Sequence, residues 1–216
     1  MSAVADQKRV ASPKVVLHDI DWPGFQALLG VVGDRSVRVA YDRGVLEIMT
    51  PLPIHERYKV LIGRIIEMMA DELGLDYFSF GSTTFQSEDL QRAIEPDACF
   101  HIASAGKIKD WRRFDPETDP PPDLAVEIDV TSDSRRRLGI YAALKIPEVW
   151  RFDGEELSVL LLQNGEYVAS KTSPTFPQAP LDALAAFARD DQGGSDRAWA
   201  AAFRRWVREV VLPGED

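Results

Sequence analysis

Residues 123–137 read DLAVEIDVTSDSRRR, and this stretch gives the first indication of the fold. Apolar residues alternate with acidic or small ones, which predicts a β-strand with two different faces. One face is purely apolar and consists of Leu124, Val126, Ile128 and Val130. The opposite face carries Glu127 and Asp129, roughly 6.6 Å apart along the backbone. Three arginines follow, and they begin a helix predicted over 135–145.

A second predicted strand, DACFHI at 97–102, repeats this arrangement. Its alternation places Asp97 on the face away from the core, so Asp97 lies across from Glu127 if the two strands are neighbours. Two converging carboxylates repel each other unless a cation sits between them, and Mg²⁺ accepts one or two carboxylates while it keeps several waters. A solvated outer face is the alternative interpretation, because a chain with 35 acidic residues contains such patterns by chance.

The order of the other elements predicts an α/β (α+β) fold with a central mixed β-sheet flanked by helices. A short helix follows the cap residue Asp21 and runs through Leu29, and a longer one runs from His55 to Leu73 and ends at Gly74. An N-terminal β-hairpin is expected at 37–49 and a second hairpin turns at Asn164-Gly165. Other extended segments are 76–80, 83–88 and 148–153, and C-terminal helices are 180–189 and 196–211.

Composition restricts the class of protein. A chain of 216 residues with 45% hydrophobic residues suits one domain with a real core. No apolar run approaches the roughly 20 residues of a membrane span, and the N-terminus lacks a signal peptide, so we expect a cytoplasmic protein with no membrane partner. The single cysteine, Cys99, excludes an internal disulfide. A net charge of −10 argues against a general nucleic-acid-coating protein but is compatible with carboxylates around a metal ion.

Several stretches resemble the Uma2 family (DUF820) of the PD-(D/E)xK restriction-endonuclease-like superfamily. They are LEIMTPLPIHE at 46–56, IEPDACF at 94–100, PPDLAVEIDVTSDS at 121–134 and IYAALKIPEVWRFDG at 140–154. The resemblance implies a single domain over 15–212 behind a disordered tail at 1–14. It also implies a restriction-endonuclease-like core at about 55–154, a C-terminal extension at about 174–212, and DNA cleavage that depends on Mg²⁺ or Mn²⁺.

The resemblance also assigns residues to the site. Asp97 takes the place of the motif aspartate and Glu127 that of the following acid, so both would bind metal and act in catalysis. The chain departs from the pattern where Asp129 replaces the motif lysine. Arg137 stands where relatives carry a helical lysine; arginine stays protonated, so it could hold a phosphate but could not act as a base. Lys145 is the less favoured substitute, and Asp129 would orient a metal-bound water.

Glu47 and His55 match family positions that flank the first proline-rich turn. His55 would support the metal site or carry a proton, and a packing or capping histidine is an equally good interpretation. Glu67, in the middle of the same helix, could reach the site or simply be solvated.

The segment KIKDWRRF at 107–114 is the candidate DNA contact. Lys107, Lys109, Arg112 and Arg113 surround a tryptophan, a mixture suited to phosphate contact and base stacking. Because this loop joins the two acidic strands, it could clamp DNA over the metal. A solvated charge run is the alternative.

Two functions remain open at this stage. The first is a metal-dependent DNA endonuclease, and the second is a catalytically decayed relative that acts as a DNA- or protein-binding module. The C-terminal helices could pack on the core or on a second subunit, so a homodimer is also expected to be feasible.

Overall fold

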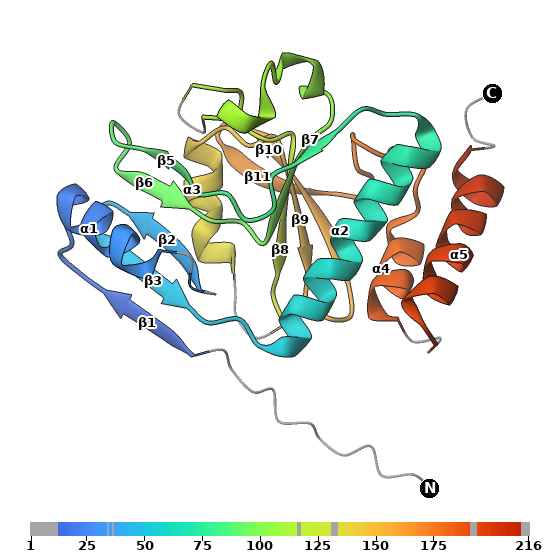
Figure 1. Cartoon of the computed structure of the whole chain (residues 1–216), viewed down its shortest axis with the longest axis horizontal. Helices are drawn as coiled ribbons and strands as arrows, with labels where there is room; N and C mark the ends of the chain where they lie inside the picture. Colours follow the sequence, from blue (N-terminus) through green and yellow to red (C-terminus); the bar gives the residue numbers. More distant parts are fainter. Residues whose placement is uncertain are drawn as a thin grey trace, which may run out of the picture.

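The structure is a computed structural model that describes residues 13–33, 35, 37–115, 118–130, 134–190 and 194–212 (Figure 1). Two β-sheets and five α-helices make up this part of the chain. The larger sheet has six strands in the order β11-β10-β9-β8-β7-β4. Their bounds are β4 Phe78–Ser79, β7 Ala98–His101, β8 Leu124–Ile128, β9 Glu148–Phe152, β10 Leu157–Gln163 and β11 Glu166–Ser170.

This six-stranded sheet is mixed, as the sequence predicts. Neighbouring strands within this sheet are antiparallel, except β8 and β9, which are parallel to each other. A parallel pair needs a crossover, and here it contains a 3-10 turn at Ser134–Arg137 and helix α3, Leu138–Ala143. The helix predicted over 135–145 is therefore shorter than expected, and Lys145 lies beyond its end with a φ of 60°.

The second sheet is larger than the predicted N-terminal hairpin. That hairpin is present as β2, Arg38–Asp42, and β3, Val45–Met49, but three further strands extend it in the order β1-β3-β2-β6-β5. The added strands are β1 Lys14–Leu17, β5 Phe85–Ser87 and β6 Arg92–Ile94. Lys14 thus belongs to a strand and not to the predicted tail, and residues 1–12 lie outside the described part.

Helices cover both sheets. Helix α1, Trp22–Val32, begins at Asp21, whose Oδ1 accepts a hydrogen bond from the Gly24 N–H at 2.9 Å, and it packs on the smaller sheet. Helices α2 (Pro53–Leu73), α4 (Leu181–Arg189) and α5 (Asp196–Trp206) cover one face of the six-stranded sheet. The C-terminal helices therefore pack on the core of their own chain. None of the described helices has both the length and the apolar character of a membrane span.

The other face of the six-stranded sheet is covered by α3 and by residues of the smaller sheet. All five residues of β8 are buried as a result. The alternative interpretation of a solvated outer face is wrong for this strand, because a second layer covers it. Cys99 lies on this face, and burial raises the pKa of its thiol to about 12, as expected for an inert cysteine.

Candidate active site

Asp97 and Glu127 lie next to each other at one end of the β7–β8 ladder. The ladder pairs Ala98 with Val126, and directly before it the Asp97 N–H donates to the Val126 carbonyl at 3.0 Å. The Asp97 carboxylate then accepts a hydrogen bond from the Ile128 N–H at 2.8 Å. Glu127 is fully buried and Asp97 is 2% exposed, so neither is the solvated surface acid of the alternative interpretation.

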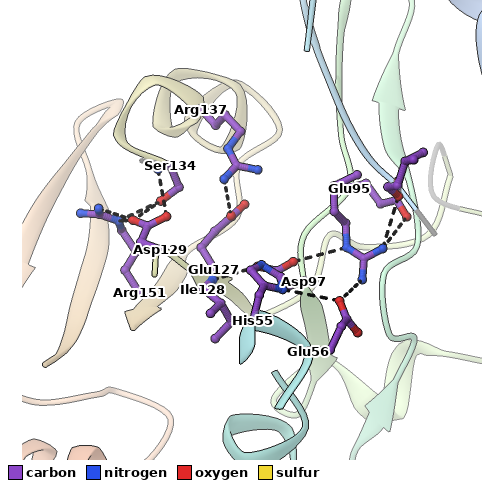
Figure 2. A network of polar contacts seen from close by, with 12 residues as sticks. His55, Glu56, Glu95, Asp97, Glu127, Ile128, Asp129, Ser134, Arg137 and Arg151 are labelled. Atoms are coloured by element: carbon purple, nitrogen blue, oxygen red, sulfur yellow. Dashed lines mark hydrogen bonds and ion pairs between the residues drawn. The ribbon is translucent and has the colours of Figure 1, made fainter. Parts of the chain in front are cut away.

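Asp97 is held by two basic side chains from other elements. His55, in the first turn of α2, places Nε2 at 3.1 Å from Oδ2 (Figure 2), and Arg38 of β2 donates from Nε to Oδ1 at 3.3 Å. Burial pushes the pKa of Asp97 upward, but the contacts with His55 and Ile128 leave it below its ordinary value. Burial lowers the pKa of His55, and the neighbouring Asp97 more than reverses this, so the net direction is upward.

Glu127 has a different set of partners. Its Oε2 lies 2.8 Å from an Nη atom of Arg137 (Figure 2). Its Oε1 accepts a hydrogen bond from the Tyr141 hydroxyl on α3. Burial raises the pKa of Glu127 to about 7, against the opposing charge of Arg137 and with a further contribution from Asp97. A buried carboxyl with a pKa near neutrality is typical of functional sites.

Arg137 connects this acid pair to a pocket of about 440 Å³. The pocket lies between the smaller sheet and α3, and it is lined by Val16, His18, Ala40, Asp42, Val45, Glu47, Arg137 and Ile140. Glu47 sits on its wall, where it pairs with Lys14 at 2.8 Å. The structure thus brings Glu47 close to Arg137, whereas His55 approaches the acid pair from the opposite side, next to Asp97.

Comparison with known proteins identifies the family. A profile of the Uma2 family, described as "Putative restriction endonuclease", matches residues 22–190, more than half of the chain. The chain belongs to the Uma2 family. Among solved structures, a crystal structure titled a "putative nuclease belonging to DUF820" from Anabaena variabilis ATCC 29413 is similar, with 13% identity, a TM-score of 0.46, and coverage of 77% of this chain and 90% of that chain. No curated protein matches the sequence.

In this Uma2 chain the Asp129 carboxylate is hydrogen-bonded to Ser134 and to Arg151. Its Oδ1 accepts from the Ser134 N–H at 2.9 Å, and its Oδ2 accepts from the Ser134 hydroxyl at 2.9 Å and from Arg151 Nε at 2.8 Å (Figure 2). These bonds use both oxygens, so the expected task of orienting a water finds no support in the geometry. Residues 131–133 between the two anchors lie outside the described part.

The basic loop lies at the far end of the sheet. The four basic residues Lys107, Lys109, Arg112 and Arg113 follow the last residue of β7, whereas Asp97 precedes the first, so a strand about 13 Å long lies between them in the chain. The geometry gives no support to the expectation that this loop clamps DNA over the acid pair, which stays a prediction. Trp111 is 54% exposed, and Arg112 stacks over its ring at 4.5 Å, so DNA contact by the loop itself stays a prediction.

Two further candidates are not brought to the site. Glu67 lies three turns beyond His55 along α2, where its pKa is raised by burial and by Asp71. Lys145 is exposed and lines a separate pocket with Phe85 and neighbours.

The sequence interpretation missed three polar contributors. Arg38 is buried and ties Asp97 to Glu56 and Glu95. Lys59, one turn after His55, is half-buried, and burial followed by the charge of Arg38 lowers its pKa. Tyr141 is buried, and its hydroxyl donates to Glu127. Its place four residues after Arg137 was the available signal, because such pairs share a helix face.

The donor set at the acid pair fits a hard divalent cation. Mg²⁺ takes one or two carboxylates and completes its shell with water and substrate oxygens. Oε2 of Glu127 is buried and has no aligned hydrogen-bond donor among the described residues, although the Arg137 guanidinium lies at ion-pair distance. No three His, Cys, Asp or Glu side chains cluster closely enough to hold a metal within the described part of the chain. An ion there would rely on Asp97 and Glu127.

Proposed function

We propose that the chain is a DNA endonuclease that depends on a divalent cation, Mg²⁺ or Mn²⁺, held by Asp97 and Glu127. The observation that carries the proposal is the buried pair of carboxylates at the end of the β7–β8 ladder, beside a guanidinium. Membership of a family described as restriction endonucleases supports the same reaction class. The proposed substrate is DNA, and the bond broken is a phosphodiester.

The residues around the acid pair would have separate roles in the proposed reaction. The cation, when bound, supplies charge neutralisation on the phosphate and activation of an attacking water. Arg38 and His55 fix the orientation of Asp97, since each contacts one of its two oxygens. Tyr141 fixes Glu127 from the other side. Arg137 carries a permanent charge and would bind a phosphate oxygen or offset transition-state charge, but it would not accept a proton.

The test is nicking of supercoiled plasmid by the purified chain with Mg²⁺ or Mn²⁺, with and without EDTA. We expect cleavage that Asp97→Asn and Glu127→Gln each reduce by at least about 100-fold, the scale of a lost electrostatic contact in a transition state. Arg57→Gln is the matched control, because Arg57 pairs with Asp190 and Asp196 away from the acid pair. Absence of cleavage of supercoiled, linear and branched DNA by folded protein would refute the proposal.

One observation favours a second function. In the structure the cationic partner of Glu127 is Arg137, so the acid pair is already neutralised without a metal ion. A chain in which this contact persists would be a binding module on a nuclease scaffold. DNA retention in a gel-shift assay without cation-dependent turnover would select this alternative.

A further inference from the structure

The Arg137 guanidinium lies where three carboxylates act on a single cation. It contacts Glu127 Oε2 at 2.8 Å, and the charges of Asp97 and Glu47 are also close enough to stabilise it. Arg137 is 5% exposed, so water screens these charges only weakly. This is the electrostatic environment that a dication would seek in the same place.

The contact between Arg137 and Glu127 is incomplete. Arginine can donate five hydrogen bonds in a planar fork, and a bidentate pair with a carboxylate uses two of them. Here Arg137 reaches Glu127 through one Nη atom at ion-pair distance, without hydrogen-bond alignment. The buried Nε of Arg137 has no hydrogen-bond partner among the described residues. The pair is therefore held by charge and not by a fitted set of bonds.

Arg137 also has a place to move to. Its side chain lines the pocket of about 440 Å³ that carries Asp42 and Glu47 on its walls. A guanidinium that left Glu127 would share the Glu47 carboxylate with Lys14, whereas Asp42 is already paired with Arg43 and Arg92. Asp97 offers no such exchange, because Arg38 and His55 hold it from within the core.

We propose that Arg137 is an internal counter-ion that competes with the dication for Glu127, so that the metal affinity of the site is set by how readily the guanidinium withdraws into the pocket beside Glu47. The inference rests on the proposed function for the identity of the metal ligands. It goes beyond that function because it makes Arg137 an antagonist of metal binding in the resting protein. Arg137 is in this sense a positioning residue, which acts through Glu127.

The test is Mn²⁺ binding measured by isothermal titration calorimetry at pH 7.5 without DNA. We expect Arg137→Gln to bind Mn²⁺ at least tenfold more tightly than the wild-type chain, because the competing cation is gone. The gain in Mn²⁺ affinity should disappear in the double variant that combines Arg137→Gln with Asp97→Asn. The control variant Arg57→Gln should bind Mn²⁺ as tightly as the wild-type chain. Equal or weaker binding by Arg137→Gln, or no binding by either chain, would overturn the inference.

A second measurement covers the case in which Arg137→Gln does not fold, as judged by circular dichroism. The Nε–Hε resonance of Arg137 in the wild-type chain, assigned by its loss in Arg137→Lys, should shift on saturation with Mg²⁺. An unchanged resonance at a Mg²⁺ concentration that shifts other site resonances would contradict displacement, and so would the absence of any Mg²⁺-induced shift. Neither experiment uses DNA, so both can be interpreted even if the protein does not cleave DNA. A wild-type chain that cleaves while binding Mn²⁺ as tightly as Arg137→Gln would refute only the inference.

Discussion

Replacing Glu127 with glutamine should remove a large pH-dependent contribution to the stability of the fold. Burial raises the pKa of this carboxyl from 4.5 to about 7. One pKa unit corresponds to about 1.4 kcal/mol between the two protonation states, so the full effect is on the order of 3 kcal/mol. Glu127 is completely buried, and solvent screening does not reduce this figure.

The sign follows from proton binding. A carboxyl with a raised pKa holds its proton in the folded state at pH values where the unfolded chain has already released it. The free energy of unfolding therefore falls as the pH rises from about 4.5 to about 7. Between pH 5 and pH 8 the Glu127 contribution falls by roughly 2–3 kcal/mol. Asp97, whose pKa is lowered, acts in the opposite sense and only at lower pH.

The assay is urea unfolding followed by the fluorescence of the five tryptophans, at pH 5 and pH 8 with EDTA. Glu127→Gln also leaves Arg137 without its charged partner, so the variant is expected to be less stable at both pH values. The informative quantity is the difference in stability between the two pH values, which should be roughly 2–3 kcal/mol smaller in the variant. An identical pH dependence in both proteins would show that the carboxyl is ionised normally and would refute the reasoning.

Three other perturbations test separate parts of the structure. Tyr141→Phe removes the buried donor to Glu127 and should cost about 1–3 kcal/mol in urea unfolding at pH 8, and less at pH 5, where the carboxyl is protonated. Gly74→Ala places a side chain at a φ of 66° after α2 and should lower the free energy of unfolding by about 1 kcal/mol, with no change in cation binding. Trp111→Ala should leave stability within about 0.5 kcal/mol because the ring is exposed, while weakening single-stranded DNA retention in a gel shift at least about fivefold if the ring stacks on bases.

Local patterns in the sequence were sufficient for the parts of the site that depend on strand alternation. The alternation in 123–130 and 97–102 correctly placed Asp97 beside Glu127, because antiparallel neighbours bring paired positions to one face. Helix α2 and its end at Gly74 followed from apolar spacing and a glycine cap. These features are each encoded within a few consecutive residues.

The features that sequence patterns did not reveal depend on contacts between distant segments. Burial of Glu127 requires α3 and the smaller sheet to cover its face, and no local pattern states this. Arg38 was overlooked because its link to Asp97 joins strands of two different sheets. The position of the basic loop relative to the acid pair also follows from the connection between strands and not from a local pattern. The loop joins the end of β7 to the start of β8, whereas Asp97 and Glu127 lie near the other end of these two strands.

The two carboxylates of the site are neutralised in different ways, and this asymmetry suggests how a ligand would enter. Asp97 is held by a backbone N–H and by His55 (Figure 2), and also by Arg38, which itself lies at ion-pair distance from Glu56 and Glu95. Breaking the contact between Arg38 and Asp97 weakens the pairing of two buried charges, which is costly. Among the described residues Glu127 has one cationic partner, Arg137, and the Arg137 side chain lines the pocket of about 440 Å³. A cation or phosphate should therefore reach the acid pair from the Glu47 side, where a single side chain has to move.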